Sequence, residues 1–379
     1  MRIVADWISS HACQTVLTLF EQSGFQAFFV GGCVRNALLG TDISDVDVAT
    51  SATPDQVVRI AQKAGIKAIP TGIDHGTVTL VVQDMPFEVT TFRRDVETDG
   101  RRAVVAFSTD VSDDARRRDF TMNALYATRH GDIVDPLGGL ADLEARRVRF
   151  IEDPETRIRE DYLRILRFFR FHAWYGDKDQ GIDADGLAAC SSNLDGLASI
   201  SRERIGHEFI KLLSAPDPSQ ALGAMEQTGV LASVLPGAST RAVFRVIHLE
   251  QGTVNPLLRL AVMGGEDTAE LLRLSKAQAR ELTLIRDISG RPMDVHEVAY
   301  RHGVEIANAV AVARAAMFEV PLQLPSGLAK ASEQKFPIKA ADLSLTGKDL
   351  GQELKRLEQI WIDSRFQISR DDLLTQARS

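Results

Sequence analysis

The sequence predicts an N-terminal α+β domain that is followed by a long all-α region. Short runs of β-branched and aromatic residues gather in about the first 135 residues, where they alternate with helix-like segments. Beyond residue 140 the β signal fades, and apolar residues recur at helical spacing. A chain of 379 residues is long for one compact core, so several domains are expected.

The elements expected in the α+β part follow from local signals. Gly24 and Gly40 are suitable helix ends, and Thr53 before Pro54 is a suitable helix start. The expected elements are a helix over 1–24, a strand over Ala27–Val30, a Gly31-Gly32 turn, a helix to Gly40, a strand over Asp45–Ala49, a helix over 54–63, strands over Thr77–Gln83 and Phe87–Phe92, and a strand-like Ile133–Val134.

Helices are expected to dominate the rest of the chain, with a Pro- and Gly-bearing linker over Val320–Gly327. The predicted helices span 155–175, 201–213, 218–228, 254–263, 268–274, 276–289, 294–301, 303–318, 347–364 and 369–377.

Composition excludes several classes of protein. No apolar run approaches the eighteen residues that a membrane span needs, and the N-terminus lacks the pattern of a secretory signal. Cys13, Cys33 and Cys190 are too few and too scattered for a disulfide framework, so a cytoplasmic location is expected. The net charge is −8, so a nucleic-acid partner would have to meet a local basic patch. No obligate protein partner is evident.

A glycine turn and a pair of aspartates are the central chemical feature. Gly31-Gly32 opens a helix that carries Arg35 in its first turns, and backbone N–H groups at such a helix start bind anions. Asp45 and Asp47 lie on a predicted strand at i and i+2, so both carboxylates point to one side. Such a pair suits Mg²⁺, which commonly binds one or two carboxylates together with substrate phosphates.

Glu88 is the candidate for a third carboxylate. It lies in a strongly β sequence, Phe87–Phe92, where an acid facing the core would need a partner. A third carboxylate is expected if two metal ions assist an in-line phosphoryl displacement. On local sequence alone, a solvent-facing strand glutamate is an equal alternative.

Three arginines, Arg116–Arg118, precede an apolar stretch that we expect to be helical. Arg118 and Asp119 begin this helix, and Asn123 follows one turn later. Arginine holds phosphate oxygens, while Asp and Asn bond ribose hydroxyls. A solvated basic turn that caps a helix is the ordinary alternative.

The predicted helix over 155–175 carries a second candidate pair. At about 100° per residue, Asp161 and Arg164 share one face and Arg167 lies further round. An acceptor beside a forked donor could bind the Watson–Crick edge of a base. The alternative, which the helix alone favours, is an ordinary i,i+3 salt bridge.

Together these residues resemble the class II tRNA nucleotidyltransferase family, which comprises CCA-adding enzymes and bacterial poly(A) polymerases of the polymerase β superfamily. FFVGGCVRNALLG followed by DVDVAT resembles the first family motif, and RRDFTMNALY, DPLGG, EDYLRILRFFRF and ISRERIGHEFIKLL resemble the next four. Their order and spacing match across residues 25–213. Asn36 is a departure, because the family usually has Asp there.

The resemblance implies a role for each candidate residue. Asp45 and Asp47 would bind the catalytic Mg²⁺, with Glu88 as the third carboxylate. Asp161 and Arg164 would select the incoming CTP or ATP, with Arg167 nearby. The remaining candidates would contact the phosphates and the ribose: Gly31, Gly32 and Arg35 the phosphates, and Arg118, Asp119 and Asn123 the triphosphate and ribose.

The resemblance also implies a polymerase β-like head with a mixed sheet and an all-α neck, body and tail. The expected boundaries are 1–139 for the head, 140–215 for the neck, 216–330 for the body and 331–379 for the tail. Body and tail would hold the tRNA acceptor end by its shape and phosphates. Neck arginines such as Arg202 and Arg204 are expected to grip phosphates.

The implied activity is CCA addition to tRNA, with three alternatives open. A poly(A) polymerase is disfavoured because residues 71–77 resemble the CCA type. An enzyme that adds only CC is disfavoured because residues 99–102 resemble the flexible loop of full CCA enzymes. A-only addition stays open. An inactive RNA-binding module is disfavoured because Asp45, Asp47 and Glu88 are all present.

Overall fold

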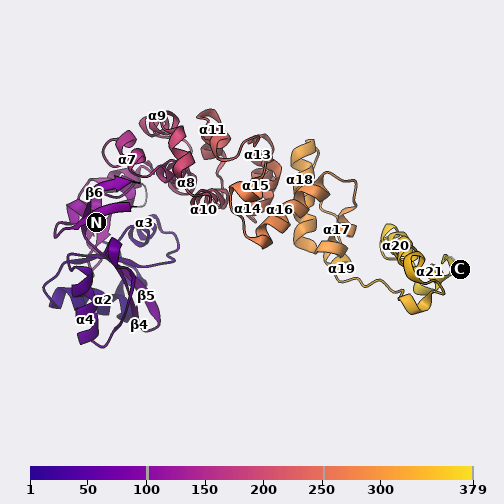
Figure 1. Cartoon of the computed structure of the whole chain (residues 1–379), viewed down its shortest axis with the longest axis horizontal. Helices are drawn as coiled ribbons and strands as arrows, with labels where there is room; N and C mark the ends of the chain where they lie inside the picture. The colour runs from indigo at the N-terminus through magenta and orange to yellow at the C-terminus, as the bar shows by residue number, and fades with distance from the viewer. Residues whose placement is uncertain (100–101, 251, 378–379) are drawn as a thin grey trace. The chain divides into compact units, whose positions relative to one another are not determined.

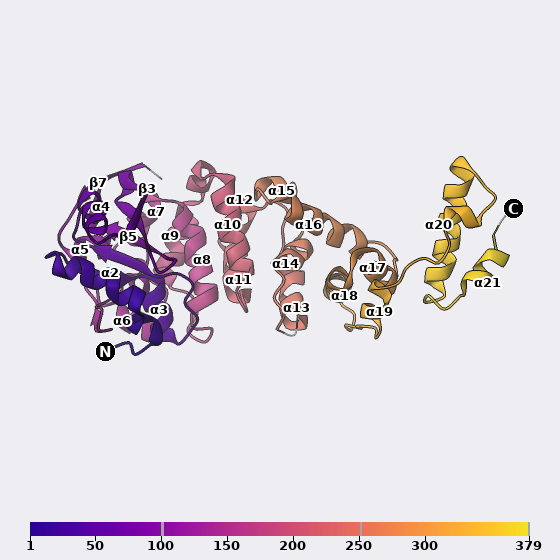
Figure 2. The same cartoon turned by 90° about the horizontal axis from the view of Figure 1, so that it is seen from below.

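The computed structural model describes residues 1–99, 102–250 and 252–377. The chain divides into two compact units, Met1–Val234 and Leu235–Ser379, which Figures 1 and 2 show from two directions. The first unit contains the sheets, and the described part of the second is built from helices. These observations confirm the expected α+β part and the all-α region after it. The finer division into head, neck, body and tail stays a prediction.

The first unit is built on a seven-stranded mixed sheet. Its strands are β1 (Ala27–Val30), β2 (Asp47–Thr50), β3 (Lys67–Gly72), β4 (Thr77–Val82), β5 (Met85–Thr91), β8 (Tyr126–Ala127) and β9 (Ile133–Val134). The strand order is β3-β4-β5-β2-β1-β8-β9. Only the β2–β5 pair is parallel among the described strands of this sheet. A separate hairpin pairs β6 (Arg93–Asp99) with β7 (Arg102–Phe107).

Helices α2 (His11–Gln22) and α4 (Pro54–Lys63) pack against the sheet and against each other. Both stand beside β4 and β5 in Figure 1. The central strands are almost continuously apolar, and Phe29, Val30 and Ala49 are buried. Because the sheet is covered in this way, the ends of β1 and β2 are held firmly where the candidate site residues follow.

The other helices of the first unit surround this sheet or follow it in the chain. They are α1 (Asp6–Ser9), α3 (Gly32–Leu39), α5 (Val111–Arg116), α6 (Gly139–Glu144), α7 (Pro154–Glu160), α8 (Leu163–Tyr175), α9 (Ala184–Ser192), α10 (Arg202–Leu213), α11 (Ser219–Gln227) and α12 (Val230–Val234), with 3-10 turns η1 (Ile73–His75), η2 (Thr121–Asn123) and η3 (Leu194–Ser199).

The second unit packs its helices around two apolar clusters. One contains Val298 and Val310, and the other is centred on Trp361. Its helices are α13 (Arg241–Leu249), α14 (Pro256–Met263), α15 (Thr268–Leu271), α16 (Lys276–Ser289), α17 (Val295–His302), α18 (Val304–Phe318), α19 (Leu328–Ser332), α20 (Gly347–Asp363) and α21 (Arg370–Thr375), with a 3-10 turn η4 (Ala340–Asp342).

Residues 320–327 contain no helix, as predicted, and they join α18 to α19, which packs against α17 and α18. Their role as a linker stays a prediction. In the part of the chain that the structure describes, no helix is both long and apolar enough to cross a membrane.

Two predicted helices are interrupted. The helix over 1–24 is wrong as a single element, because Ser10 ends α1 and its Oγ accepts the Cys13 N–H that begins α2. The helix over 155–175 breaks at Asp161, whose φ of −154° and ψ of 103° are extended. The Asp161 carboxylate accepts the N–H of Leu163 at 3.2 Å, so it supports the start of α8.

Two predictions near the site are also corrected. The second strand begins at Asp47, so Asp45 lies in the preceding loop. The stretch from Arg118 is not an α-helix: it contains only the short η2 turn, and Tyr126 then pairs with Val30 of β1. Strand pairing and burial of Tyr126 outweigh the helical pattern there.

Candidate active site

Gly31 links β1 to α3 and brings the backbone close to two predicted site residues. Its φ of 71° is left-handed, a conformation that favours glycine. A Cβ at this position would lie 3.3 Å from Nη1 of Arg118 and 3.9 Å from Oδ1 of Asn123. A side chain here would therefore displace the arginine. Gly32 follows as the first residue of α3 and lines a pocket together with Arg35.

Arg35 is buried and tightly held. Its Nη1 donates to Oδ1 of Asn123 at 2.8 Å, and its Nη2 donates to the Tyr175 hydroxyl at 2.8 Å. The guanidinium also stands over the Tyr175 ring, 4.0 Å from its centroid. Burial lowers the pKa of Arg35, with Arg170 and Arg167 adding to the effect. An anionic ligand beside Arg35 would offset the unfavourable burial of its positive charge.

Asn36, the departure from the family pattern, supports Arg35. Its Oδ1 accepts from Nη2 of Arg35 at 2.9 Å, and its Nδ2 donates to the Asp42 carbonyl at 2.7 Å. The amide thus keeps an acceptor for the arginine that a carboxylate would also provide, and it adds a donor that ties down the loop before Asp45.

The three predicted carboxylates come together from two strands and a loop. Asp47 of β2 is the register partner of Glu88 on the parallel strand β5. Asp45 lies two residues earlier and lines the same pocket as Asp47, Gly32 and Arg35. Burial raises the pKa of Asp47 to about 6, with Glu88 and Asp45 adding to the rise and Arg118 opposing it.

This donor set fits a divalent cation that is shared with a substrate. In the described residues, no group of three or more His, Cys, Asp or Glu side chains is arranged to hold a metal alone. Carboxylate oxygens are nevertheless the ligands that hard cations prefer, and such ions complete their shell with water and phosphate. A cation here would offset the mutual repulsion of Asp45, Asp47 and Glu88.

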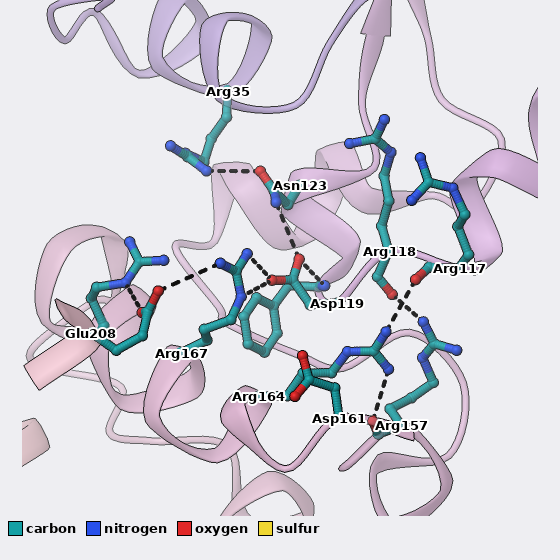
Figure 3. A network of polar contacts seen from close by, with 12 residues as sticks. Arg35, Arg117, Arg118, Asp119, Asn123, Arg157, Asp161, Arg164, Arg167 and Glu208 are labelled. Carbon is teal, nitrogen blue, oxygen red and sulfur yellow. Dashed lines mark hydrogen bonds and ion pairs between the residues drawn. The ribbon is translucent and has the colours of Figure 1, made fainter. Parts of the chain in front are cut away.

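A second pocket carries the predicted nucleotide contacts. Asp119 is buried and accepts from Arg167 Nε at 2.7 Å and from Asn123 Nδ2 at 3.1 Å. Burial opposes its ionisation, but Arg167 and these hydrogen bonds hold the pKa of Asp119 below its usual range. Figure 3 shows the resulting chain from Arg35 through Asn123 and Asp119 to Arg167. Nine residues line this pocket: Arg117, Arg118, Asp119, Asn123, Asp161, Leu163, Arg164, Arg167 and Arg204.

Asp161 and Arg164 both line this pocket, although for a different reason than predicted. Because the helix breaks at Asp161, the two residues do not share one continuous helical face. The alternative of an Asp161–Arg164 salt bridge is also wrong. Asp161 pairs with Arg204 at 2.6 Å, and Arg164 pairs with Glu160 at 2.5 Å.

Several residues that hold the site were absent from the predictions. Asp114 is fully buried and pairs with Arg117 and Arg118 at 2.7 and 3.0 Å. Its spacing of three and four residues from these arginines is the signal that could have identified it. Glu208, which pairs with Arg170 at 2.5 Å, and Tyr175 come from distant parts of the sequence. Arg204 was expected to grip RNA phosphates, but the structure places it against Asp161.

The structure thus groups the predicted residues into two neighbouring pockets. Gly32, Arg35, Asp45 and Asp47 line the first, with Glu88 beside Asp47. Arg118, Asp119, Asn123, Asp161, Arg164 and Arg167 line the second. Arg35 connects them, since it lines the first and bonds Asn123 of the second. The arrangement provides an acidic place for a cation beside a pocket rich in arginine.

Comparison with known families finds two stretches of the chain that match family models. Residues 27–149 match the family described as Poly A polymerase head domain. Residues 181–241 match the family described as Probable RNA and SrmB- binding site of polymerase A. Polymerase β-like nucleotidyltransferases of this kind typically use a divalent metal.

Similar proteins span nearly the whole chain. CCA tRNA nucleotidyltransferase 1, mitochondrial, of Mus musculus is 32% identical over 96% of this chain and 88% of its own length. A CCA-adding enzyme of Geobacillus thermodenitrificans is 33% identical over 88% of this chain and 85% of its own. The crystal structure of Bacillus stearothermophilus CCA-adding enzyme in complex with CTP has a TM-score of 0.71 at 27% identity, covering 96% of this chain and 95% of that one. The chain therefore belongs to the class II family of CCA-adding enzymes and poly(A) polymerases.

Proposed function

We propose that this chain adds C, C and A to the 3′ end of tRNA from CTP and ATP, without a nucleic-acid template. The observation that carries this proposal is the link between the pocket of the carboxylates and the arginine-rich pocket: Arg35 lines the first and bonds Asn123 of the second. A nucleotide whose base lies in the arginine-rich pocket would extend its phosphates toward Asp45 and Asp47. Relatives named as CCA-adding enzymes over most of their length support the same reaction.

The reaction is a nucleotidyl transfer. The terminal 3′-hydroxyl oxygen of the RNA bonds to the α-phosphorus of the nucleotide, and the hydroxyl proton is released to water. The α–β phosphoanhydride bond breaks, and pyrophosphate leaves. Asp45 and Asp47, with Glu88, would hold Mg²⁺, which supplies charge to stabilise the α-phosphate oxygens and the departing pyrophosphate. The protein contributes mainly positioning and electrostatic stabilisation.

The other residues would bind and orient the nucleotide. The start of α3 at Gly31 and Gly32 would offer backbone N–H groups to phosphate oxygens, beside Arg35 and Arg118. Asp119 and Asn123 would face the ribose. Asp161 and Arg164 would contact the base edge, with Arg167 held nearby by Asp119.

The roles of the domains and the location of the protein in the cell are also proposals. Residues 1–139 would form the catalytic head, 140–215 the neck that selects the base, and 216–330 and 331–379 the body and tail that bind tRNA. A reducing cytoplasm would suit the three free and buried cysteines.

Single-nucleotide assays test the activity. Transcripts of tRNA that end before C74, C75 or A76 are incubated with CTP or ATP alone and with both. One C, then another C, and then one A is the expected pattern. Repeated A addition would favour a poly(A) polymerase, and addition of only CC or only A would identify a partial enzyme. Residues 99–102, which favour full CCA addition in the sequence, include 100 and 101, which lie outside the described residues.

Tight tRNA binding without any addition would favour an inactive RNA-binding module. That outcome would contradict the proposal, because Asp45, Asp47 and Glu88 would then serve no catalytic purpose.

A further inference from the structure

Asp161 is held from outside its own helix. Arg204, in the first turn of α10, donates through Nη1 to Oδ1 of Asp161 at 3.2 Å and through Nη2 to Oδ2 at 2.6 Å. Both side chains are only partly exposed, 18% for Arg204 and 21% for Asp161, and both line the arginine-rich pocket. A paired fork of this kind fixes the plane of a carboxylate as well as its charge.

This pairing leaves the Asp161 carboxylate with one acceptor position. Each carboxylate oxygen can accept about two hydrogen bonds. Oδ1 already accepts from Arg204 and from the Leu163 N–H at 3.2 Å, whereas Oδ2 accepts from Arg204 alone among the described residues. One lone-pair site on Oδ2 therefore stays available to a ligand in the pocket.

A similar count applies to the donors of Arg164. Its Nη1 donates to the Arg157 carbonyl at 2.7 Å and to Oε2 of Glu160 at 2.5 Å, which uses both Nη1 hydrogens. Its Nη2 donates once, to the Arg117 carbonyl at 3.2 Å. Within the described part of the chain, Nε–H and one Nη2 hydrogen have no acceptor, so Arg164 keeps donors for a ligand.

The two remaining groups match cytosine and adenine. Both bases present an amino donor beside a ring-nitrogen acceptor on their Watson–Crick edge. Uracil and guanine present the reverse, a carbonyl acceptor beside a ring N–H. A pocket with one acceptor on Asp161 and a donor on Arg164 would thus accept CTP and ATP and reject UTP and GTP.

We propose that Arg204 is a positioning residue for nucleotide selection, because it holds Asp161 away from Arg164 and so preserves one acceptor and one donor for the base. Asp161 and Arg164 are only three residues apart, and without Arg204 the carboxylate would be free to turn and pair with Arg164. Asp161 and Arg164 would then pair with each other and would no longer be available to the base. This inference rests on the proposed CCA-adding function and assigns to α10 a part in its specificity.

The test compares Arg204→Gln and Arg204→Lys with Arg202→Gln. Arg202 is exposed at the start of the same helix, so its variant controls for charge loss on α10. Single-nucleotide addition gives kcat and KM for CTP, ATP, UTP and GTP, and tRNA affinity and Tm are measured alongside. Arg204→Gln is expected to raise KM for CTP and ATP and to lower the CTP-to-UTP preference about 10-fold or more. Arg204→Lys should recover part of that preference. Arg202→Gln, whatever its effect on tRNA binding, should keep the wild-type CTP-to-UTP preference.

A second experiment, made in a protein that carries Asp161→Asn, distinguishes a positioning role of Arg204 from a general contribution to stability. In an Asp161→Asn protein, adding Arg204→Gln should cause little further loss of selectivity, because both changes remove the same interaction. An unchanged CTP-to-UTP preference in Arg204→Gln would overturn the proposal, as would a full additional loss in the Asp161→Asn background. If Arg204→Gln does not fold, Arg204→Lys is judged on the same ratio. Failure of the proposed function is a different result, in which the wild-type chain adds neither C nor A.

Discussion

Asp47 on β2 and Glu88 on β5 are direct register partners on parallel strands. Their side chains therefore emerge on the same side of the sheet, and burial and the Glu88 charge raise the pKa of Asp47 to about 6. Two acids placed side by side destabilise the fold unless a cation or a proton joins them. Glu88 is exposed, as the alternative of a solvent-facing strand glutamate expects, so the metal assignment is supported by its register pairing with Asp47 and stays a prediction.

Removing either aspartate should abolish nucleotide addition and leave tRNA binding largely intact. Asp45→Ala and Asp47→Ala each remove an oxygen ligand of the proposed Mg²⁺ site but leave the helical region unchanged. Primer-extension rates and tRNA affinity are the measurements, with Asp371→Ala as an acidic control on α21. Addition at a near wild-type rate by either site variant would disprove the metal assignment.

The raised pKa of Asp47 predicts a pH-dependent effect of Mg²⁺ on stability. Since the pKa rises from 3.8 to about 6 on folding, the ionised carboxylate destabilises the metal-free fold. The cost is absent below pH 4, grows from pH 4 to 6, and reaches at most about 3 kcal/mol. Without Mg²⁺, Asp47→Asn should thus have a higher Tm than wild type at pH 8 and a similar Tm near pH 4.

Added Mg²⁺ should reverse this order above pH 6, because the cation binds the wild-type carboxylates and has little affinity for the variant. Thermal melts of both proteins at pH 4 and pH 8, with Mg²⁺ and with a chelator, give the comparison. Equal Mg²⁺ stabilisation of wild type and Asp47→Asn would show that the ion binds elsewhere.

Binding to tRNA should weaken with salt although the net charge is −8. Each lysine or arginine that neutralises a phosphate releases counterions, so the slope of log affinity against log salt counts such contacts. Of the two arginines predicted to contact phosphates, Arg204 pairs with Asp161 and Arg202 is exposed. We expect further contacts from exposed lysines of the proposed tail. Lys348 and Lys355 lie seven residues apart on α20 and are both exposed.

A double Lys348→Ala, Lys355→Ala variant should therefore lower the magnitude of the slope by about 1 to 2. Filter-binding titrations over a range of salt provide the slopes, with Lys63→Ala on α4 as a control outside the tail. If the affinity of the wild-type protein for tRNA does not change from low to moderate salt, binding through contacts to RNA phosphates is contradicted.

Local sequence was sufficient for much of the fold. It also singled out residues that the structure brings together in two pockets, although their roles stay predictions. The Gly31 turn, the α4 start and most later helices follow from caps, glycines and periodicity that act within a few residues. The break at Asp161 could not be predicted in this way. At this break the Asp161 carboxylate accepts the Leu163 N–H and also pairs with Arg204, which lies 43 residues away in the sequence. Tyr126 likewise became a strand residue because β1 was available as its partner.

The sharpest prediction concerns Asp161→Ala. The change removes the acceptor proposed for the amino group of cytosine and adenine and leaves Arg204 without its partner. A hydrogen bond lost from a partly buried carboxylate is worth on the order of 1–3 kcal/mol, so discrimination against UTP and GTP should fall by roughly 5- to 150-fold. The ratio of CTP and ATP to UTP and GTP incorporation measures the effect.

The control must be an ion pair that does not touch the pocket. Arg170 is unsuitable because it bonds Glu208, which also pairs with Arg167. Arg159 is better, since its exposed pair with Glu155 on α7 is an ordinary surface contact worth a few tenths of a kcal/mol. Arg159→Ala should keep wild-type selectivity. If Asp161→Ala also keeps it and loses only stability, then the Asp161–Arg204 pair serves the fold alone, and base selection must be assigned to other residues.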